Sequence, residues 1–283
     1  MKEEVVKASL VLDLVGSLRS DIPGIGTKKI YFLLHQGFRK SGIKMGRDKL
    51  HNLLKSENLL IRSKRKMPKT TNSNHWMKKY PNLIKDLKVS STEELWVCDL
   101  TYLCVGKDFS YLSLITDAHS RMIVGYCLHQ FLTTEGCLIA LDMALSKRKK
   151  NQGSLIHHSD RGSQYCSLAY IQKLRSANIK VSMTDNGDPY ENAMAERVNG
   201  ILKADFKLNR VFKTQEEAQI AVQVSIDNYN NLRPHMSCDY MTPCHAHQLD
   251  EPLIERWKVN SKKHFSSNPS SPIAGENEFK KNE

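Results

Sequence analysis

Three acidic residues stand at positions where a carboxylate is unusual. Asp99 lies inside the stretch WVCDLTYL, which is apolar on both faces of the strand that it predicts, with Leu95 and Val97 on the face of Asp99 and Trp96 and Cys98 on the other. Burying an ionised acid without a partner costs several kcal/mol, so we expect Asp99 to pair with a basic side chain or to bind a cation.

The second acid, Asp160, follows the predicted strand 154–158 in HHSDRGSQY. Open α/β sheets bind their ligands beyond the carboxyl ends of such strands. Gly162 permits a tight turn and Ser163 suits the start of a helix. Taken alone, Asp160 is equally well explained as a turn aspartate.

The third acid, Glu196, falls on the polar side of the helix predicted from PYENAMAERVNGILKADF. At about 100° per residue, that side carries two amides, a glycine and a lysine besides the acid, whereas Glu191 falls on the apolar side. The residues of the polar side are Asn192, Glu196, Asn199, Gly200 and Lys203.

Three carboxylates in one site repel one another unless a cation joins them. Oxygen ligands without a thiolate favour Mg²⁺, with Mn²⁺ as the alternative, over zinc. Two such ions roughly 3.5–4 Å apart support in-line phosphoryl transfer. We therefore predict that Asp99, Asp160 and Glu196 form a catalytic metal site that holds two Mg²⁺ ions, with Lys203 facing a phosphate backbone.

The elements around these acids predict an α/β fold. Helices are expected at 4–19, 26–37 and 46–57, before three strand-like runs, of which 95–105 is the first. A helix at 134–147, a strand at 154–158, a helix from about 166 to 176, a strand at 180–183 and a helix from about 190 to 208 are expected to follow. Thr214 and Glu217 form a capping box that opens a last long helix. This order predicts a mixed five-stranded sheet with helices on both faces, preceded by a small all-α region. The expected parts are a helical DNA-binding region (1–61), a basic linker (62–90), a catalytic core (91–250) and a largely disordered C-terminal extension (251–283).

Charge indicates a polyanionic partner for the first of these parts. The net charge is +12, and residues 1–90 hold 20 Lys and Arg against 7 Asp and Glu, while the other 193 residues hold 22 against 23. A stripe on the helix 46–57 could read a DNA major groove, or could be an ordinary solvated face. The stripe consists of Arg47, His51, Asn52 and Lys55.

The basic linker is the second candidate for contact with DNA. Residues 62–82 have no apolar period and carry seven Lys and Arg, which suits phosphate contacts, although a merely soluble linker would look similar. The four basic residues that we select are Arg62, Lys64, Arg65 and Lys66.

The cysteine content and the apolar segments indicate the cellular compartment of the protein. The seven cysteines form no Cys-x-x-Cys pair, which favours a reduced, cytoplasmic protein. The first residues do not match a signal peptide, and no run approaches the roughly 20 apolar residues of a membrane span. We expect no membrane partner.

The motifs HSDRGSQY, GDPYENAMAE and YNNLRPHMSCDYMTP resemble the second-frame protein of the IS-three family of bacterial insertion sequences. GIGTKKIYFLL and MGRDKLHNLLKSENLL resemble the helix-turn-helix of that family, so the resemblance covers about residues 10 to 250. The acids resemble the triad of DDE transposases and retroviral-type integrases, and the 35 residues between Asp160 and Glu196 are the spacing typical of that superfamily.

This resemblance implies an RNase H-like core and Mg²⁺-dependent DNA cleavage and strand transfer without a covalent protein–DNA intermediate. It implies that Asn199 and Lys203 face DNA. Gln164 lies in a motif of the family, and we predict that it is a third residue of the core that contacts DNA. The expected partners are the ends of the element and its target DNA, bound by a homo-oligomer near the bacterial nucleoid. The first-frame protein of the family does not precede Met1, so we expect it as a partner or as a frameshift fusion.

Other readings of the same residues are weaker. A zinc site from His235, Cys238, Cys244, His245 and His247 matches no trusted ligand spacing. His157 and His158 suit structural roles, and Asp117 suits a turn cap better than a fourth acid of the site. Two alternative functions stay open at this point: a DNA-binding regulator without catalysis, and an RNase H-like nuclease that cuts DNA without joining it.

Overall fold

The computed structural model describes residues 2–61, 75–148, 153–185 and 189–249. Three helices come first, and β-strands then alternate with further helices as the sequence predicts. The helices are α1 (Lys2–Asp21), α2 (Thr27–Lys40), α3 (Arg47–Ser56), α4 (Thr134–Lys147), α5 (Ser163–Cys166), α6 (Leu168–Ser176), α7 (Ala193–Asp205), α8 (Gln215–Asn231) and α9 (Pro243–Leu249). The strands are β1 (Leu95–Val105), β2 (Asp108–Asp117), β3 (Ile123–His129), β4 (Ile156–Ser159), β5 (Lys180–Met183) and β6 (Val211–Phe212).

The sheet is mixed, which confirms the predicted α/β fold class. Its strand order is β3-β2-β1-β4-β5. β2 pairs antiparallel with β1 and β3, whereas β4 pairs parallel with β1 and β5. β6 adds a sixth, two-residue strand beside β1 that the sequence analysis did not foresee. A strand this short has no hydrophobic period to detect.

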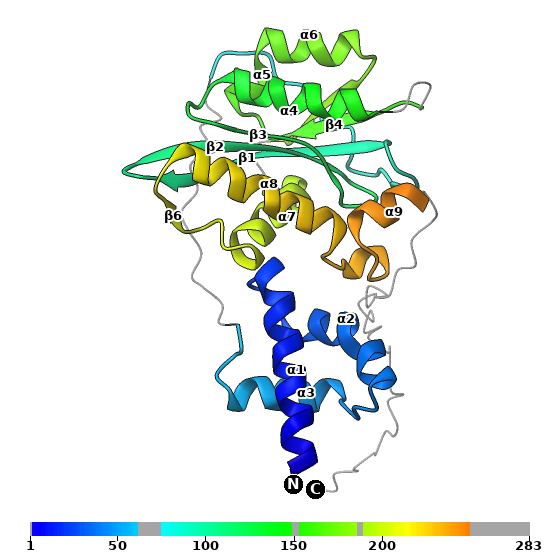
Figure 1. Ribbon diagram of the computed structural model, residues 1–283. Helices are drawn as coiled ribbons and strands as arrows, with labels where there is room; N and C mark the ends of the chain where they lie inside the picture. Colours follow the sequence, from blue (N-terminus) through cyan, green and yellow to red (C-terminus); the bar gives the residue numbers. More distant parts are fainter. Residues whose placement is uncertain (1, 62–74, 149–152, 186–188, 250–283) are drawn as a thin grey trace, which may run out of the picture.

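Helices cover both faces of the sheet (Figure 1). α4, α5 and α6 lie on one face, where Trp96 and Cys98 of β1 pack with them in one apolar cluster. α7 and α8 lie on the other face, where Leu95 and Val97 pack against Ala195 of α7. β1 therefore buries both of its sides, as its continuous apolar sequence predicts.

The three N-terminal helices pack directly against the face of the core that carries α7 and α8. A single apolar cluster contains residues of α1, α2 and α3 together with residues of α7 and α8. Gly24 marks the closest approach, since a Cβ atom there would lie 2.4 Å from the carbonyl oxygen of Ala204. The Gly24 amide donates to the Asp205 carbonyl (2.6 Å), and the ring of Phe32 stacks on that of Tyr240 at 4.6 Å.

Within the residues that the structure describes, none of the helices combines the length and the apolar composition that a bilayer crossing requires.

Candidate active site

Asp99 lies on the face of β1 that is covered by α7, as the alternation of the strand predicts. The side chain is half-buried, and one of its oxygens accepts a hydrogen bond from Nδ2 of Asn199 at 2.8 Å. Burial, followed by the charge of Asp160, raises the pKa of Asp99 from 3.8 to about 7. An acid in this setting holds its proton near neutral pH until a positive charge takes its place.

Asp160 lies beside Asp99 because of the register of β1 and β4. Val97 pairs with His158 in this parallel ladder, and each acid follows its paired residue by two positions. Neighbouring strands lie about 4.8 Å apart, so the two carboxylates project from adjacent positions on the same side. Oδ1 of Asp160 accepts the amide of Gly162 at 2.9 Å, which fixes the turn after β4.

Glu196 approaches the two aspartates from α7. Asn192, four residues earlier, donates to the carbonyl of Cys98 at 3.0 Å, and Asn199, three residues later, donates to Asp99. Glu196 thus stands between two amides that hold α7 on β1, and its negative charge contributes to the raised pKa of Asp99. Its own side chain is exposed.

The three acids are near neighbours, but their carboxylate oxygens do not form one compact group of ligands. Within the described residues, the groups of three possible ligands that lie within 4.8 Å of one another do not include Asp99, Asp160 and Glu196. Two of the three acids are placed by the sheet, and the third is carried by a helix with its carboxylate turned to solvent.

Two residues expected to face DNA make contacts inside the protein. Asn199 is buried, and its Oδ1 has no hydrogen-bond partner. Nζ of Lys203 donates to Oγ1 of Thr101 at 2.6 Å and lies 4.6 Å from the ring centre of Tyr102. Burial lowers the pKa of Lys203 while the charge of Asp99 raises it, and the lowering prevails.

Gln164, the third such residue, lies in α5 directly after the turn of Asp160. Its Nε2 donates to the carbonyl of Leu132 at 3.3 Å. The neighbouring Tyr165 is buried in the apolar cluster on the α4 side of the sheet, which explains its place in the motif by packing.

A second acidic group, the closed cluster, consists of Glu93, Asp117 and His247, which offer ligand atoms within 4.8 Å of one another. Asp117 is the turn cap that the sequence indicates, since its Oδ1 accepts from the amide (2.8 Å) and the hydroxyl (2.7 Å) of Ser120. Its Oδ2 accepts the amide of Glu93 at 2.8 Å. The sequence pattern did not predict a role for Glu93, because its surroundings, SSTEEL, are typical of a loop.

His247 joins this cluster rather than a zinc site. Its Nδ1 lies 3.8 Å from Asp117, and its Nε2 lies 3.6 Å from Glu93. The two ring nitrogens therefore face two different acids. In the described part of the chain, the cysteines and histidines of the rejected zinc pattern do not gather into a group of three.

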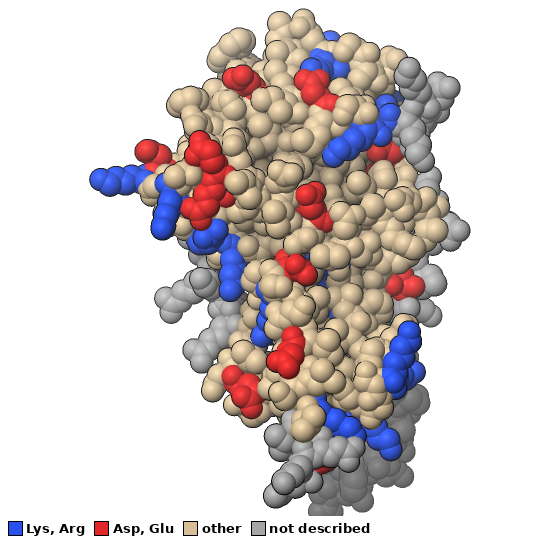
Figure 2. Space-filling model, viewed as in Figure 1, with Lys and Arg blue, Asp and Glu red and all other residues tan. Residues whose placement is uncertain are grey.

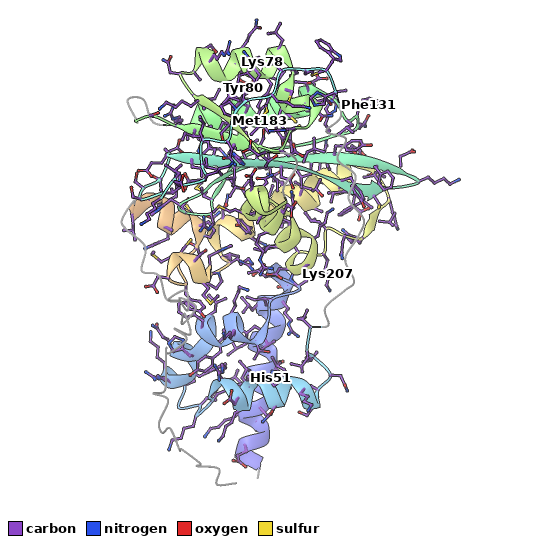
Figure 3. The ribbon with its side chains drawn as sticks, turned by 180° about the vertical axis from the view of Figure 1, so that it is seen from behind. His51, Lys78, Tyr80, Phe131, Met183 and Lys207 are labelled. Carbon is purple, nitrogen blue, oxygen red and sulfur yellow. The ribbon has the colours of Figure 1, made fainter. Side chains whose placement is uncertain are left out.

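The predicted recognition stripe lies on the solvent side of α3. Arg47, His51, Asn52 and Lys55 are all exposed, opposite the buried Leu50 and Leu54, and Figure 3 labels His51 there. Next to it, the turn between α2 and α3 borders a hollow of about 650 Å³. Basic residues of that hollow are Arg39, Lys44, Arg47 and Lys49.

On the face shown in Figure 2, blue and red side chains are interspersed, without one continuous basic surface. The selected linker residues Arg62, Lys64, Arg65 and Lys66 lie outside the described residues.

Comparison with known proteins matches two integrase core domain families, over residues 90–189 and 177–243. The insertion element IS600 31 kDa protein of Shigella sonnei is 36% identical over 206 residues, which cover 72% of this chain and 75% of the relative. This chain belongs to the IS-three family of insertion-sequence transposases. As a DDE-type transposase it acts in DNA transposition.

Other relatives of this transposase agree. The transposase of IS629 from Shigella sonnei is 40% identical over 141 residues, covering 50% of this chain and 47% of that protein. Transposase InsF of IS3A from Escherichia coli is 30% identical over 192 residues, or 67% of this chain and 66% of InsF. The intasome of simian T-cell lymphotropic virus in complex with a PP2A regulatory subunit contains a similar fold (TM-score 0.50, 18% identity, 87% of this chain and 80% of the other).

Proposed function

We propose that Asp99, Asp160 and Glu196 form the catalytic triad of this transposase and hold two Mg²⁺ ions, with Mn²⁺ as an alternative, for DNA cleavage and strand transfer. One observation carries the proposal. Asp99 and Asp160 stand side by side on adjacent parallel strands, close enough that the charge of Asp160 helps to raise the pKa of Asp99 to about 7.

The donors around this pair suit a hard divalent cation. The charge of one carboxylate acts on the other, and the buried Oδ1 of Asn199, whose Nδ2 donates to Asp99, has no hydrogen-bond partner. Of the nearby thiol and imidazole groups, Cys98 and His157 bond to each other, and Cys98 points to the opposite face of β1. Nδ1 of His158 bonds to Oγ of Ser182 at 2.8 Å. Oxygen ligands alone favour Mg²⁺ or Mn²⁺. When bound, a pair of such ions stabilises both the attacking and the leaving oxygen of a phosphoryl transfer.

The chain itself contributes position and charge. Asn199 fixes the rotamer of Asp99, and the Gly162 amide fixes that of Asp160. Glu196, exposed and held between two anchored amides, completes the site by rotating its side chain toward the aspartates. Lys203 lies one helical turn beyond Asn199, where its ammonium group can leave Thr101 to neutralise a DNA phosphate.

The proposed reaction has two steps. Water attacks the phosphodiester at the end of the insertion sequence and its bond to the 3′-oxygen breaks, which frees a 3′-hydroxyl and leaves the phosphate on the flanking strand. This hydroxyl then attacks a phosphodiester of the target, and the 3′-oxygen of the target strand leaves. The α3 stripe and the basic linker bind the DNA, Gln164 lies close to its reacting strand, and several chains assemble because two ends must be held at once. The site of action is the bacterial nucleoid, and the first-frame protein is the proposed protein partner.

The test is a strand-transfer assay with labelled DNA that carries the ends of the element, with and without Mg²⁺. We expect cleaved and joined products from the full chain with Mg²⁺ and none from Asp160→Asn. Metal-independent activity that is equal in both proteins would overturn the proposal. DNA binding without cleavage would instead indicate a regulator, and cleavage without joining of a pre-cut end would indicate a nuclease.

A further inference from the structure

Residues 75–83, which we call the arm segment, pack against the catalytic core. The amide of Leu83 donates to Oγ of Ser182 at 2.9 Å, and the carbonyl of Pro81 accepts the amide of Met183 at 3.3 Å. Met77 and Tyr80 pack against the apolar cluster on the α4 side of the sheet. Figure 3 shows Tyr80 and Lys78 with Met183 on that side. The backbone of the arm segment is therefore fixed.

The N-terminal end of the arm segment reaches the turn of the proposed active site. Nε2 of His75 lies 2.7 Å from the carbonyl oxygen of Arg161, the residue that follows Asp160. Trp76 is the next residue, and consecutive Cα atoms are only 3.8 Å apart. The arm segment thus anchors the residue before Trp76 on the turn that follows Asp160.

The side chain of Trp76 makes little contact with the rest of the protein. Its side chain is 92% exposed, although His75 before it and Met77 after it are both held by the core. An indole presents a large apolar surface that is normally buried. A fixed backbone that turns this ring to solvent beside a reactive site indicates a surface for a ligand.

The side chains near Trp76 in the chain and in the fold indicate the chemical class of its ligand. Lys78 and Lys79 are exposed on the same segment, and Arg175 lies 5.8 Å from the ring of Tyr80. The nearby acid Asp185 already pairs with Lys85 and Arg161. A flat aromatic ring among lysines matches a nucleic acid, which offers base faces for stacking and phosphates for the ammonium groups.

We propose that Trp76 stacks on a nucleobase of the DNA end held at Asp99, Asp160 and Glu196, while Lys78 and Lys79 contact the neighbouring phosphates. The proposal rests on the function proposed above. The faces of a base inside a duplex are covered by its stacked neighbours, so the base on which Trp76 stacks is unstacked from them next to the scissile phosphate. The DNA recognised here is thus a locally opened end.

The experiment uses the full chain without divalent metal, so that no DNA is cut, and element-end DNA in which 2-aminopurine stands unpaired and unstacked at one position after another beside the scissile phosphate. Stacking on an aromatic ring quenches the emission of this base. We expect quenching at one or two positions with the wild type and with Trp76→Phe, and none with Trp76→Leu. We also expect about tenfold weaker binding by Trp76→Leu at every salt concentration.

Two matched variants separate stacking from charge. Salt dependence is measured as the slope of log affinity against log salt concentration. Lys78→Gln and Lys79→Gln should each reduce this slope by about one, the value for one lost phosphate contact, whereas Trp76→Leu should leave the slope unchanged. Because Trp76 is exposed, its variants should unfold at the wild-type temperature.

Equal emission and equal affinity in wild type and Trp76→Leu would overturn the stacking proposal. A loss of self-association in Trp76→Leu with unchanged DNA binding would overturn it in favour of a protein contact. Either result leaves the loss of cleavage in Asp160→Asn untouched, so this failure is distinguishable from a failure of the proposed function.

Discussion

The proposed triad and the closed cluster place the same kind of side chain in opposite surroundings. In the closed cluster, Asp117 accepts three hydrogen bonds from Ser120 and Glu93, and Glu93 lies 3.4 Å from Nε of Arg148. In the proposed triad, Asp99 accepts hydrogen bonds from the side-chain amide of Asn199 and from the backbone of Leu100, and it also faces the charges of Asp160 and Glu196.

The pKa values reflect this difference. Burial acts to raise the pKa of Asp117, but hydrogen bonds from His247, Ser120 and Glu93 outweigh it, and the pKa falls below its ordinary value. Burial and a second acid act together on Asp99 and raise its pKa. Asp117, a buried acid with several donors, is therefore structural, although burial and the charge of Asp117 raise the pKa of Glu93 beside it. We expect Asp99, whose pKa burial and Asp160 raise together, to need a cation. The presence of several potential metal ligands close together does not by itself identify a metal site.

The largest effect should come from Glu196→Gln. The variant should cleave DNA about 10³-fold more slowly, because a carboxylate that completes the cation site is lost, and its stability should be unchanged because the side chain is exposed. Single-turnover cleavage and thermal unfolding measure the two quantities. Glu216→Gln, an exposed acid in the first turn of α8, is the matched control and should cleave at the wild-type rate.

Asp117→Ala should show the reverse pattern. Three donors lose their buried acceptor, so the free energy of unfolding should fall by about 3–5 kcal/mol while each folded molecule keeps its cleavage rate. Urea denaturation gives the stability. Asp108→Ala removes an exposed acid at the other end of β2 and should change the stability by less than about 0.5 kcal/mol. Loss of cleavage in a folded Asp117→Ala protein would contradict the separation of the two groups.

Magnesium should stabilise the protein through the triad alone. At a concentration ten times the dissociation constant, Mg²⁺ should add about 1.4 kcal/mol to the free energy of unfolding. This gain should vanish in Asp160→Asn and persist in Glu93→Gln. The opposite result, a gain that depends on Glu93, would make the closed cluster the cation site.

The smallest effect concerns pH in metal-free buffer. The pKa of Asp117 is lowered, so its stabilising contribution is present above about pH 4 and disappears as the pH falls through the lowered pKa. The pKa of Asp99 is raised from 3.8 to about 7, so the folded protein holds a proton there that the unfolded chain releases, and stability falls as pH rises across that interval.

Asp99→Asn should therefore be more stable than the wild type by about 1 kcal/mol at pH 8, a figure reduced for the half-exposed carboxyl, and should show no such gain near pH 4. Urea midpoints at the two pH values measure this difference. A gain of equal size at both would show that the amide improves packing and that the charge is irrelevant.

Much of the fold could be predicted from hydrophobic period and from turn and cap residues. The helix 134–147 and the strands 95–105 and 180–183 have the predicted bounds, and Thr214 caps α8 by accepting the amide of Glu217. The helix expected from about 166 to 176 is divided, with α5 ending at Cys166 and Ser167 capping α6. A single capping serine is a weak signal beside a continuous apolar pattern.

The candidate site was predicted residue by residue only where one element decides the direction of a side chain. Strand alternation put Asp99 on its face, and helix period put Asn192, Glu196 and Asn199 on theirs. The same period could not tell that Asn199 bonds to Asp99 and Lys203 to Thr101, because both partners lie about 100 residues away in the chain.

Sequence alone thus determined the elements, the acids and the family, since period, spacing and motif are local properties of the chain. Only the tertiary structure decided which acids receive hydrogen bonds from other residues and that residues 75–83 lie along the core. It also decided that Trp76 is exposed next to His75, whose ring lies against the carbonyl of Arg161. Donors and acids from distant segments meet only when the sheet register and helix packing are set, and their electrostatic interaction depends on that distance and on burial.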